Sequence, residues 1–278
     1  VEDVLRVFAV VEGPDEADPY TAEAGAHTLP PFGALLDPQA LEGTRIGILR
    51  DLVDRERTDS AVLRVFDAAM ERLGELGAEV IEVSIDLETQ LARPDMFCRR
   101  FRYDMAQYLA TLGDDAPFRG VAAVLEQGAY HPSNEGTLRR SVEAPLSAPG
   151  EWDPPCPDFA GNPSRQAFRS AVVAAMDQAE VVALVHPTWG APPARLRHAD
   201  EDYRGDHSQR VAPATGLPAL TVPMGWTYER LPAGLQFVGR PWSDARLLSL
   251  AWAWEQATQH RRSPEGFGPL AAGDERTP

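Results

Sequence analysis

The segment 198–208 contains several side chains that could bind a metal ion or take part in catalysis. His198, Asp202, Asp206, His207 and Ser208 supply carboxylates, imidazoles and a hydroxyl. These groups could hold a divalent cation, but their spacing matches neither the EF-hand pattern nor a zinc site. The last three could also suggest a serine triad, yet triads are assembled across a fold, and no Gly-X-Ser-X-Gly turn is present. We expect a solvated acidic loop that provides no metal ligand and no catalytic group.

The absence of lysine restricts the chemistry that this sequence can perform. The chain contains no lysine, so all 26 of its basic side chains are arginine. Arginine stays protonated near neutral pH and cannot serve as a general base. The absence of lysine also excludes a Walker-loop lysine and a pyridoxal Schiff base. No Gly-X-Gly-X-X-Gly follows a predicted strand, so the sequence predicts no cofactor.

Composition narrows the class of protein. The net charge is −16 and no basic stripe is present, which disfavours nucleic-acid binding. No apolar run is long enough to span a membrane, and the amino terminus lacks the pattern of a signal peptide. Cys98 and Cys156 are too few for a disulfide framework and lack metal-ligand spacing. We therefore predict a cytoplasmic protein with two reduced thiols.

The first half of the chain predicts a parallel pair of strands. A helix with apolar residues at helical spacing begins at Val1 and stops before Gly13-Pro14. An apolar strand at 45–49 precedes a helix that Asp59 or Ser60 caps and Gly77 closes. A second strand follows at 80–85. Strand, helix and strand in this order form a βαβ unit with a right-handed crossover.

The second half predicts further helices and strands around one irregular segment. Two helices occupy 94–130, and 131–163 is rich in Pro, Gly and Ser, as expected of an irregular loop or lid. The sequence then predicts a helix at 164–178 and strands at 181–185, 219–222 and 233–238. The last predicted element is a helix at 244–258, which Ser243 caps. Residues 261–278 are predicted to be a tail. The whole is α/β: a mixed sheet flanked by helices.

Five motifs, in a fixed order, resemble one enzyme family. The clearest are GLPALTVPMG at 216–225 and LPAGLQFVGRP at 231–241. Three further segments match the family in the same order along the chain. They are the Gly13-Pro14-Asp15 turn, the strand 45–49 and the strand end 184–188. The chain is similar to the carboxyl-terminal part of amidase signature proteins from Val1 to about Thr258. We therefore interpret 1–278 as a single partial domain, an incomplete amidase-signature domain.

The resemblance implies hydrolysis of a carboxamide to a carboxylic acid plus ammonia or amine, without metal or cofactor. In the family, a lysine acts through a second serine on a serine nucleophile, and glycine-rich backbone amides bind the oxyanion. This sequence has no lysine and no Gly-Gly-Ser-Ser run. The resemblance therefore implies that the chain holds no catalytic residue and is inactive alone. A separate amino-terminal chain could complete it.

Four residues are the candidates for substrate binding. Thr188 and Trp189 follow a predicted strand at its carboxyl end, where open α/β sheets place ligands, and Asp206 and Ser208 lie in the acidic loop. The expected partners are a small amide substrate and a complementing amino-terminal chain or a second copy of this chain. The alternatives are a truncated, inactive remnant, an interaction subunit, or the amidotransferase subunit that acts on charged tRNA.

Overall fold

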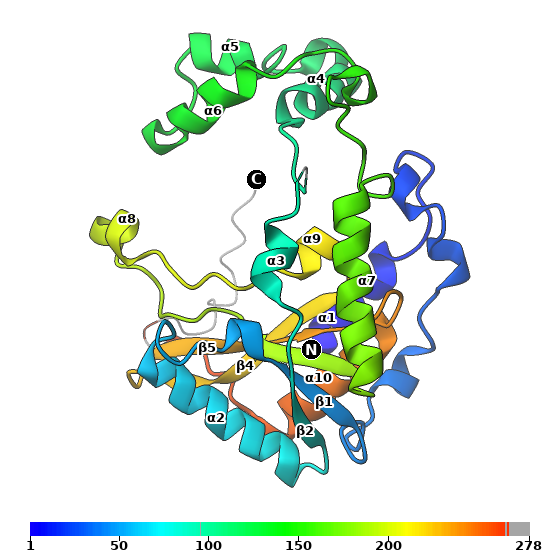
Figure 1. The fold of residues 1–278 in the computed structure, drawn as a ribbon, viewed down its shortest axis with the longest axis vertical. Coiled ribbons are helices and arrows are strands. Elements are labelled where there is room, and N and C mark those ends of the chain that lie inside the picture. Colours follow the sequence, from blue (N-terminus) through cyan, green and yellow to red (C-terminus); the bar gives the residue numbers. More distant parts are fainter. Residues whose placement is uncertain (95, 265, 267–278) are drawn as a thin grey trace, which may run out of the picture. The chain divides into compact units, whose positions relative to one another are not determined.

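The computed structural model describes residues 1–94, 96–264 and 266 (Figure 1). By their internal contacts these residues fall into two compact units. Unit 1 comprises 1–87 and the chain from 171 onward, and unit 2 comprises 88–170. The sequence interpretation treats the chain as one partial domain, whereas the contacts separate the helical segment in its middle from the rest.

A mixed sheet of five strands forms the centre of unit 1 within the described residues, in the order β2-β1-β3-β5-β4. The strands are β1 (Arg45–Leu49), β2 (Glu79–Val83), β3 (Ala183–Pro187), β4 (Ala219–Thr227) and β5 (Leu231–Val238). β1 is parallel to both β2 and β3, whereas β5 is antiparallel to both β3 and β4. The predicted α/β mixed sheet is confirmed. β3 lies two residues later than predicted, and β4 extends five residues beyond the predicted end.

The βαβ unit forms as the sequence indicates. α2 (Ser60–Glu75) connects β1 to β2, and the carboxylate of Asp59 accepts a hydrogen bond from the Ala61 amide at its start. Gly77, with φ of 87°, makes the turn into β2 in a conformation that favours glycine. The turn also brings Gly77 against Glu42, where a Cβ would lie 3.2 Å from the Glu42 backbone. The local sequence was sufficient to predict this unit, because the helix cap and the glycine turn each depend on residues close together in the chain.

The main core lies between one face of the sheet and two helices, α2 and α10 (Asp244–Thr258). Alternate strand residues point to opposite faces, so Val185, Phe237 and Val222 reach this core together. Trp254 of α10 is fully buried there, and its indole donates to the Pro223 carbonyl at 2.9 Å. Ser243 occupies the predicted cap position of α10, but its hydroxyl donates to the Arg240 carbonyl and not to the helix.

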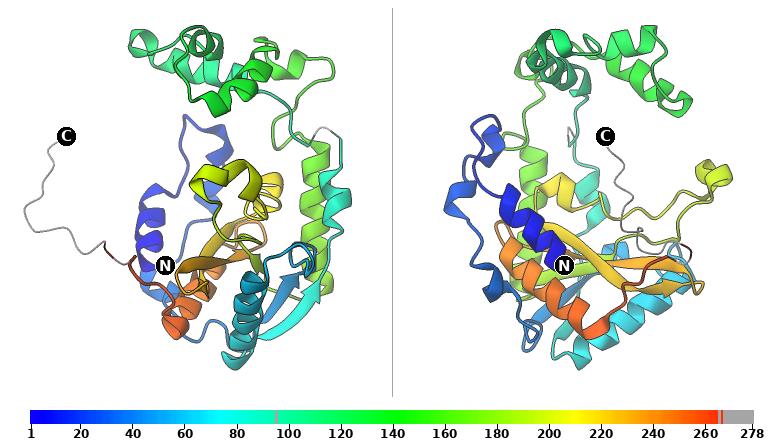
Figure 2. Two further views of the ribbon diagram at one scale, coloured as in Figure 1. Left: turned by 90° about the vertical axis from the view of Figure 1, so that its left-hand side faces the viewer. Right: turned by 180° about the vertical axis from the view of Figure 1, so that it is seen from behind.

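α1 (Glu2–Val11) lies beside α10 (Figure 2, right). Leu5 is buried with Leu35 and Leu248 in a second small core, and the Val1 ammonium contacts the Glu255 carboxylate at 2.7 Å. The other side of the helix is apolar but uncovered, since Val4, Val7, Val10 and Val11 are 55–83% exposed.

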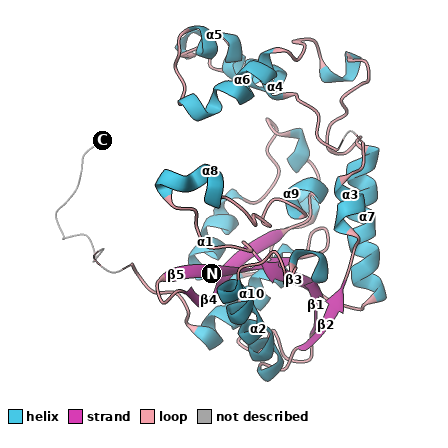
Figure 3. Cartoon of the chain, turned by 60° about the vertical axis from the view of Figure 1, so that its left-hand side comes forward, coloured by secondary structure: helices cyan, strands magenta, loops and turns pink. Residues whose placement is uncertain are grey.

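The remaining helices are short apart from α7 (Pro163–Gln178), which begins in unit 2 and ends in unit 1 before β3. α8 (Ala199–Asp202) and α9 (Ala212–Thr215) lie between β3 and β4 in the chain. Unit 2 is built from α4 (Phe101–Thr111), α5 (Val121–Glu126) and α6 (Glu135–Val142), with α3 (Leu87–Leu91) at its boundary. None of its described residues forms a strand (Figure 3). α6 falls inside the segment 131–163 that was predicted to be irregular.

The prediction of two reduced thiols is wrong for this structure, because Cys98 and Cys156 form a disulfide within unit 2. Their Cα atoms lie 5.9 Å apart, inside the range that a disulfide spans. A count of two cysteines 58 residues apart gives no information about that proximity, which arises only when unit 2 folds.

Among the described helices none is long and apolar enough to cross a membrane. Most of the predicted tail, 267–278 together with 265, lies outside the described residues. The described part from 261 to 264 contains neither helix nor strand.

Candidate functional site

The two predicted binding segments lie next to each other. The His207 amide donates to the Thr188 carbonyl at 3.1 Å, and Trp189 pairs with Asp206 in an antiparallel bridge. The Gly190 amide also donates to the Gly205 carbonyl at 2.6 Å. These backbone contacts join the segment after β3 to the loop after α8. Thr188, Trp189, Asp206 and Ser208 therefore form one neighbourhood, although the sequence separates them by about 20 residues.

The Asp206 carboxylate organises this neighbourhood. Its oxygens accept hydrogen bonds from the Ser208 hydroxyl at 2.6 Å, the Ser208 amide at 3.0 Å and the Gln209 side chain at 3.1 Å. The Tyr203 hydroxyl donates to the same carboxylate at 3.2 Å. Burial, followed by this hydrogen bond, raises the pKa of Tyr203. Asp206 thus fixes the loop and sets the position of the Tyr203 ring.

Two histidines near the end of β3 do not activate a nucleophile. Both His186 and His207 donate through Nδ1 to the Pro187 carbonyl, at 2.9 and 3.3 Å. Burial lowers the pKa of His186 to about 4 and also lowers the pKa of His207, so both rings are neutral at pH 7. The Ser208 hydroxyl donates to Asp206 and not to an imidazole. The sequence neighbours Asp206, His207 and Ser208 therefore do not form a serine triad.

The acidic loop is held by ion pairs and contains no metal centre in the part of the chain that the structure describes. Arg195 binds Asp202 through two of its nitrogens and lowers the pKa of that carboxylate to about 2. His198 contacts Glu201 at 3.2 Å. Most of these side chains are exposed to solvent.

A pocket of about 600 Å³ opens beside Thr188 and Trp189. Its wall includes the edge-to-face pair of Trp189 and Tyr203, with ring centroids 5.2 Å apart. Asp206 and Ser208 do not line the pocket but support its aromatic wall through Tyr203 and the backbone bridge. The full lining is Val62, Thr188, Trp189, Ala191, Pro192, Pro193, Ala194, Tyr203, Thr221, Val222, Pro223, Thr227, Pro232, Ala233 and Gly234.

Sequence reasoning missed two residues of this pocket, the polar Thr221 and Gly234, which allows a close approach. The register places Thr221 opposite Gln236 and Thr188 beside Gly234, so all four lie on the sheet face away from the main core. The Thr188 and Thr221 hydroxyls are hydrogen-bonded at 3.0 Å. A Cβ at Gly234 would lie 2.8 Å from the Thr188 hydroxyl, so only glycine allows this approach. Strand alternation could have assigned Thr221 to this face, but nothing in the sequence reports the register.

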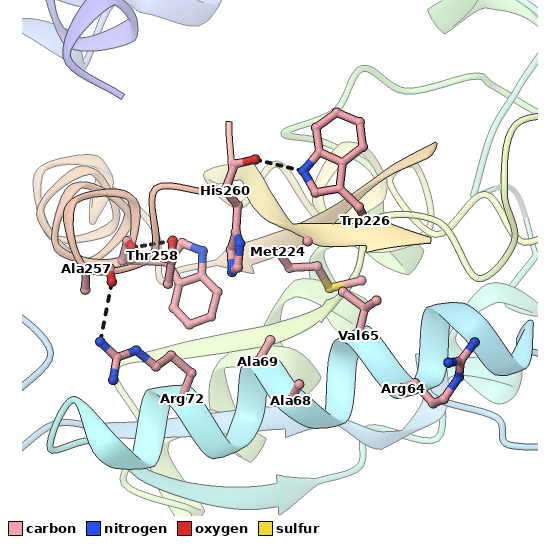
Figure 4. A pocket seen from close by; sticks show the side chains of 12 residues that line it. Arg64, Val65, Ala68, Ala69, Arg72, Met224, Trp226, Ala257, Thr258 and His260 are labelled. Carbon is pink, nitrogen blue, oxygen red and sulfur yellow. Dashed lines mark hydrogen bonds between the residues drawn. The ribbon is translucent and has the colours of Figure 1, made fainter. Parts of the chain in front are cut away.

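A second pocket, of about 460 Å³, lies where α2, β4 and the end of α10 meet (Figure 4). Its surface combines apolar side chains, such as Val65 and Met224, with the His260 imidazole that points toward its centre. Arg72 closes one side by donating to the Ala257 carbonyl at 3.4 Å, and the Trp226 indole donates to the His260 carbonyl at 2.9 Å. Arg64 and Arg72 thus border this pocket, whereas no described residue that lines the pocket at Thr188 is an arginine.

The α/β fold and the order of its strand motifs define an amidase-type protein. The chain belongs to the Amidase family, whose model matches residues 1–248. This confirms the resemblance that the five sequence motifs indicate.

Two curated relatives are glutamyl-tRNA(Gln) amidotransferase A subunits. That of Symbiobacterium thermophilum is 27% identical over 282 residues, which cover 95% of this chain and 54% of the relative. That of Synechococcus sp. strain CC9605 is 29% identical over 274 residues, which cover 93% and 53%. The chain thus spans about half the length of the curated relatives it matches.

Among solved structures, the chain is similar to the native peptide amidase from Stenotrophomonas maltophilia. The two are 28% identical and superpose with a TM-score of 0.74 over 95% of this chain and 53% of the peptide amidase. A complex of peptide amidase with the competitive inhibitor chymostatin is also 28% identical, with a TM-score of 0.71.

Proposed function

We propose that this chain is the carboxyl-terminal part of an amidase that hydrolyses a small carboxamide to a carboxylic acid plus ammonia or amine. The pocket at Thr188 and Trp189 forms part of the substrate site, and Asp206 and Ser208 hold its aromatic wall in place. The reaction needs no metal or cofactor and takes place in the cytoplasm. The serine nucleophile and the lysine base come from polypeptide outside these 278 residues, because this sequence contains neither a Gly-Gly-Ser-Ser run nor a lysine.

The pocket beyond the carboxyl end of β3 is the observation that carries this proposal. Open α/β sheets bind ligands at this position, and a lining of apolar side chains with a few hydroxyls is typical of small-molecule sites. Membership of the Amidase family supports an amide as the ligand.

The uncovered side of α1 supports the need for further polypeptide. Val4, Val7 and Val11 recur at helical spacing and are 55–68% exposed. Contiguous apolar surface that is exposed in this way is characteristic of protein–protein interfaces. We assign it to the polypeptide that carries the serine and lysine.

The test begins with the DNA immediately upstream of the Val1 codon. We expect it to encode a lysine and a Gly-Ser-Ser run, in frame or as an adjacent gene. The encoded polypeptide is then produced with this chain, and ammonia release from carboxamides is measured. We expect release from the assembled protein and none from the 278-residue chain alone.

A matched pair of variants tests the α1 surface. Val7→Arg should prevent assembly, whereas Leu146→Arg, at a similarly exposed apolar residue of unit 2, should not. Ammonia release from the chain alone would refute the assignment of the catalytic groups. An assembled protein without amidase activity would favour the alternative, an interaction subunit.

A further inference from the structure

The pocket at Thr188 has an electrically neutral lining. Among the described residues that line it, none carries an acidic, arginine or histidine side chain. In a chain of net charge −16, this absence distinguishes the pocket from the surrounding surface. Moving a charged group from water into such a lining costs several kcal/mol, because no opposite charge compensates for the lost hydration. The lining therefore disfavours a charged ligand group.

An aromatic wall forms one side of the pocket. The Trp189 and Tyr203 rings are nearly perpendicular, at 87°, with centroids 5.2 Å apart. The Tyr203 hydroxyl donates to the Asp206 carboxylate, and the Trp189 backbone pairs with the Asp206 backbone, so both aromatic residues are linked to Asp206. A preorganised aromatic wall favours a flat or bulky apolar group, since the rings lose little conformational freedom on binding.

A pair of hydroxyls is the polar anchor of the pocket. One of the Thr188 and Thr221 hydroxyls donates to the other at an oxygen–oxygen distance of 3.0 Å, so the O–H of the second hydroxyl and several lone pairs remain for a ligand. A neutral amide needs both, because its carbonyl accepts and its N–H donates. The Thr227 hydroxyl is already committed to the Leu231 carbonyl.

We propose that this pocket selects neutral amides with an apolar or aromatic side chain, and that Thr221 determines this specificity through its hydroxyl pair with Thr188. This inference rests on the proposed amidase function and specifies its substrate class. Free glutamine, which carries both an ammonium and a carboxylate, is a poor ligand for the same pocket.

Calorimetric titration of the 278-residue chain, whose residues line this pocket, with N-acetylphenylalaninamide tests the inference. N-acetylphenylalanine is the matched probe for charge, because it differs from the amide only by a carboxylate in place of the carboxamide. Glutamine is the second comparison, an amide that carries charged groups. We expect the amide to bind more than about tenfold more tightly than either, since the lining offers no charge to pair with a carboxylate. Equal or tighter binding of the acid or of glutamine would overturn the proposal.

Three substitutions locate the effect. Thr221→Val should weaken binding of the amide about fivefold, the value of one net hydrogen bond, and Thr221→Ser should restore it. Thr258→Val is the control, because the Thr258 hydroxyl bonds to the Trp254 carbonyl and borders the other pocket. An unchanged affinity in Thr221→Val, or an equal loss in Thr258→Val, would refute the role of Thr221.

Ammonia release from the assembled protein separates this inference from the proposed function. Release from glutamine but not from N-acetylphenylalaninamide would overturn the substrate class and leave the amidase function standing. Binding of N-acetylphenylalaninamide without ammonia release from any carboxamide would overturn the function and leave the pocket's preference for neutral amides.

Discussion

The two units of this protein are stabilised in different ways. Unit 1 packs two long helices against a sheet, and its core includes the fully buried Phe66, Phe237 and Trp254. The α-helices that lie wholly within unit 2 have 6 to 11 residues, and isolated helices of this length are marginal in water. Unit 2 also contains the disulfide between Cys98 and Cys156. We therefore expect burial to dominate the stability of unit 1 and the disulfide to contribute a larger share of the stability of unit 2.

The largest effect should follow removal of the biggest core side chain of unit 1. Trp254→Ala leaves a cavity in the main core and an unpaired Pro223 carbonyl, so we expect a loss near the upper end of ~3–5 kcal/mol. Denaturant unfolding gives the free energy. Trp242→Ala, at a half-exposed tryptophan stacked on His27, should cost far less. Similar losses in both variants would contradict a core-dominated unit 1.

Removal of the disulfide should affect unit 2 alone. The two cysteines are 58 residues apart, and loop-closure entropy assigns such a link about 4 kcal/mol. In the double variant Cys98→Ser/Cys156→Ser, hydrogen exchange should accelerate in α4, α5 and α6 while the strands of unit 1 keep their protection. Equal acceleration in both units would show that the chain unfolds as one body.

The redox state of the same pair tests the proposed location. Disulfides persist in oxidising compartments and are reduced in the cytosol. The disulfide of the structure and the proposed cytoplasmic location therefore predict opposite results for thiol labelling in intact cells. Labelling of Cys98 and Cys156 would support the location, and protection of both would support the disulfide. A fully oxidised pair would contradict that location.

Acid should weaken unit 1 through His186. Burial lowers its folded pKa from 6.5 to about 4, so the unfolded chain takes up a proton at higher pH than the folded chain. Neutral His186 makes its full contribution to the free energy of unfolding above pH 6.5. This contribution is lost as the pH falls, and the loss approaches roughly 3 kcal/mol near pH 4. Melting temperatures between pH 7 and 4 should fall less steeply in His186→Gln. An unchanged slope would exclude His186 as the cause.

Helix capping should give the smallest difference. Asp59→Ala removes the hydrogen bond to the Ala61 amide at the start of α2, at an expected cost of about 1 kcal/mol. Asn134 precedes α6 of unit 2 without a side-chain cap, so Asn134→Ala should change stability by a few tenths of a kcal/mol at most. Denaturation of the two variants measures both effects. A larger loss for Asn134→Ala would reverse the comparison.

Local patterns in the sequence were sufficient for the βαβ unit, the last helix and the family. The bounds of α2, β1 and α10 follow from apolar spacing, a capping aspartate and a closing glycine, all of which act over a few residues. Only part of the pocket lining could be predicted from the sequence. Thr188 and Trp189 could be placed by the end of a strand, but Thr221, Tyr203 and Gly234 enter the pocket through strand register and loop packing.

The sequence by itself determined the family and the α/β class, because residue types and short-range periodicity carry this information. The tertiary structure alone decided three further features. It brought Trp189 to Asp206, aligned the hydroxyls of Thr188 and Thr221, and joined Cys98 to Cys156. Each depends on contacts between residues that are far apart in the chain, and these form only when the sheet register and the packing of the loops are complete.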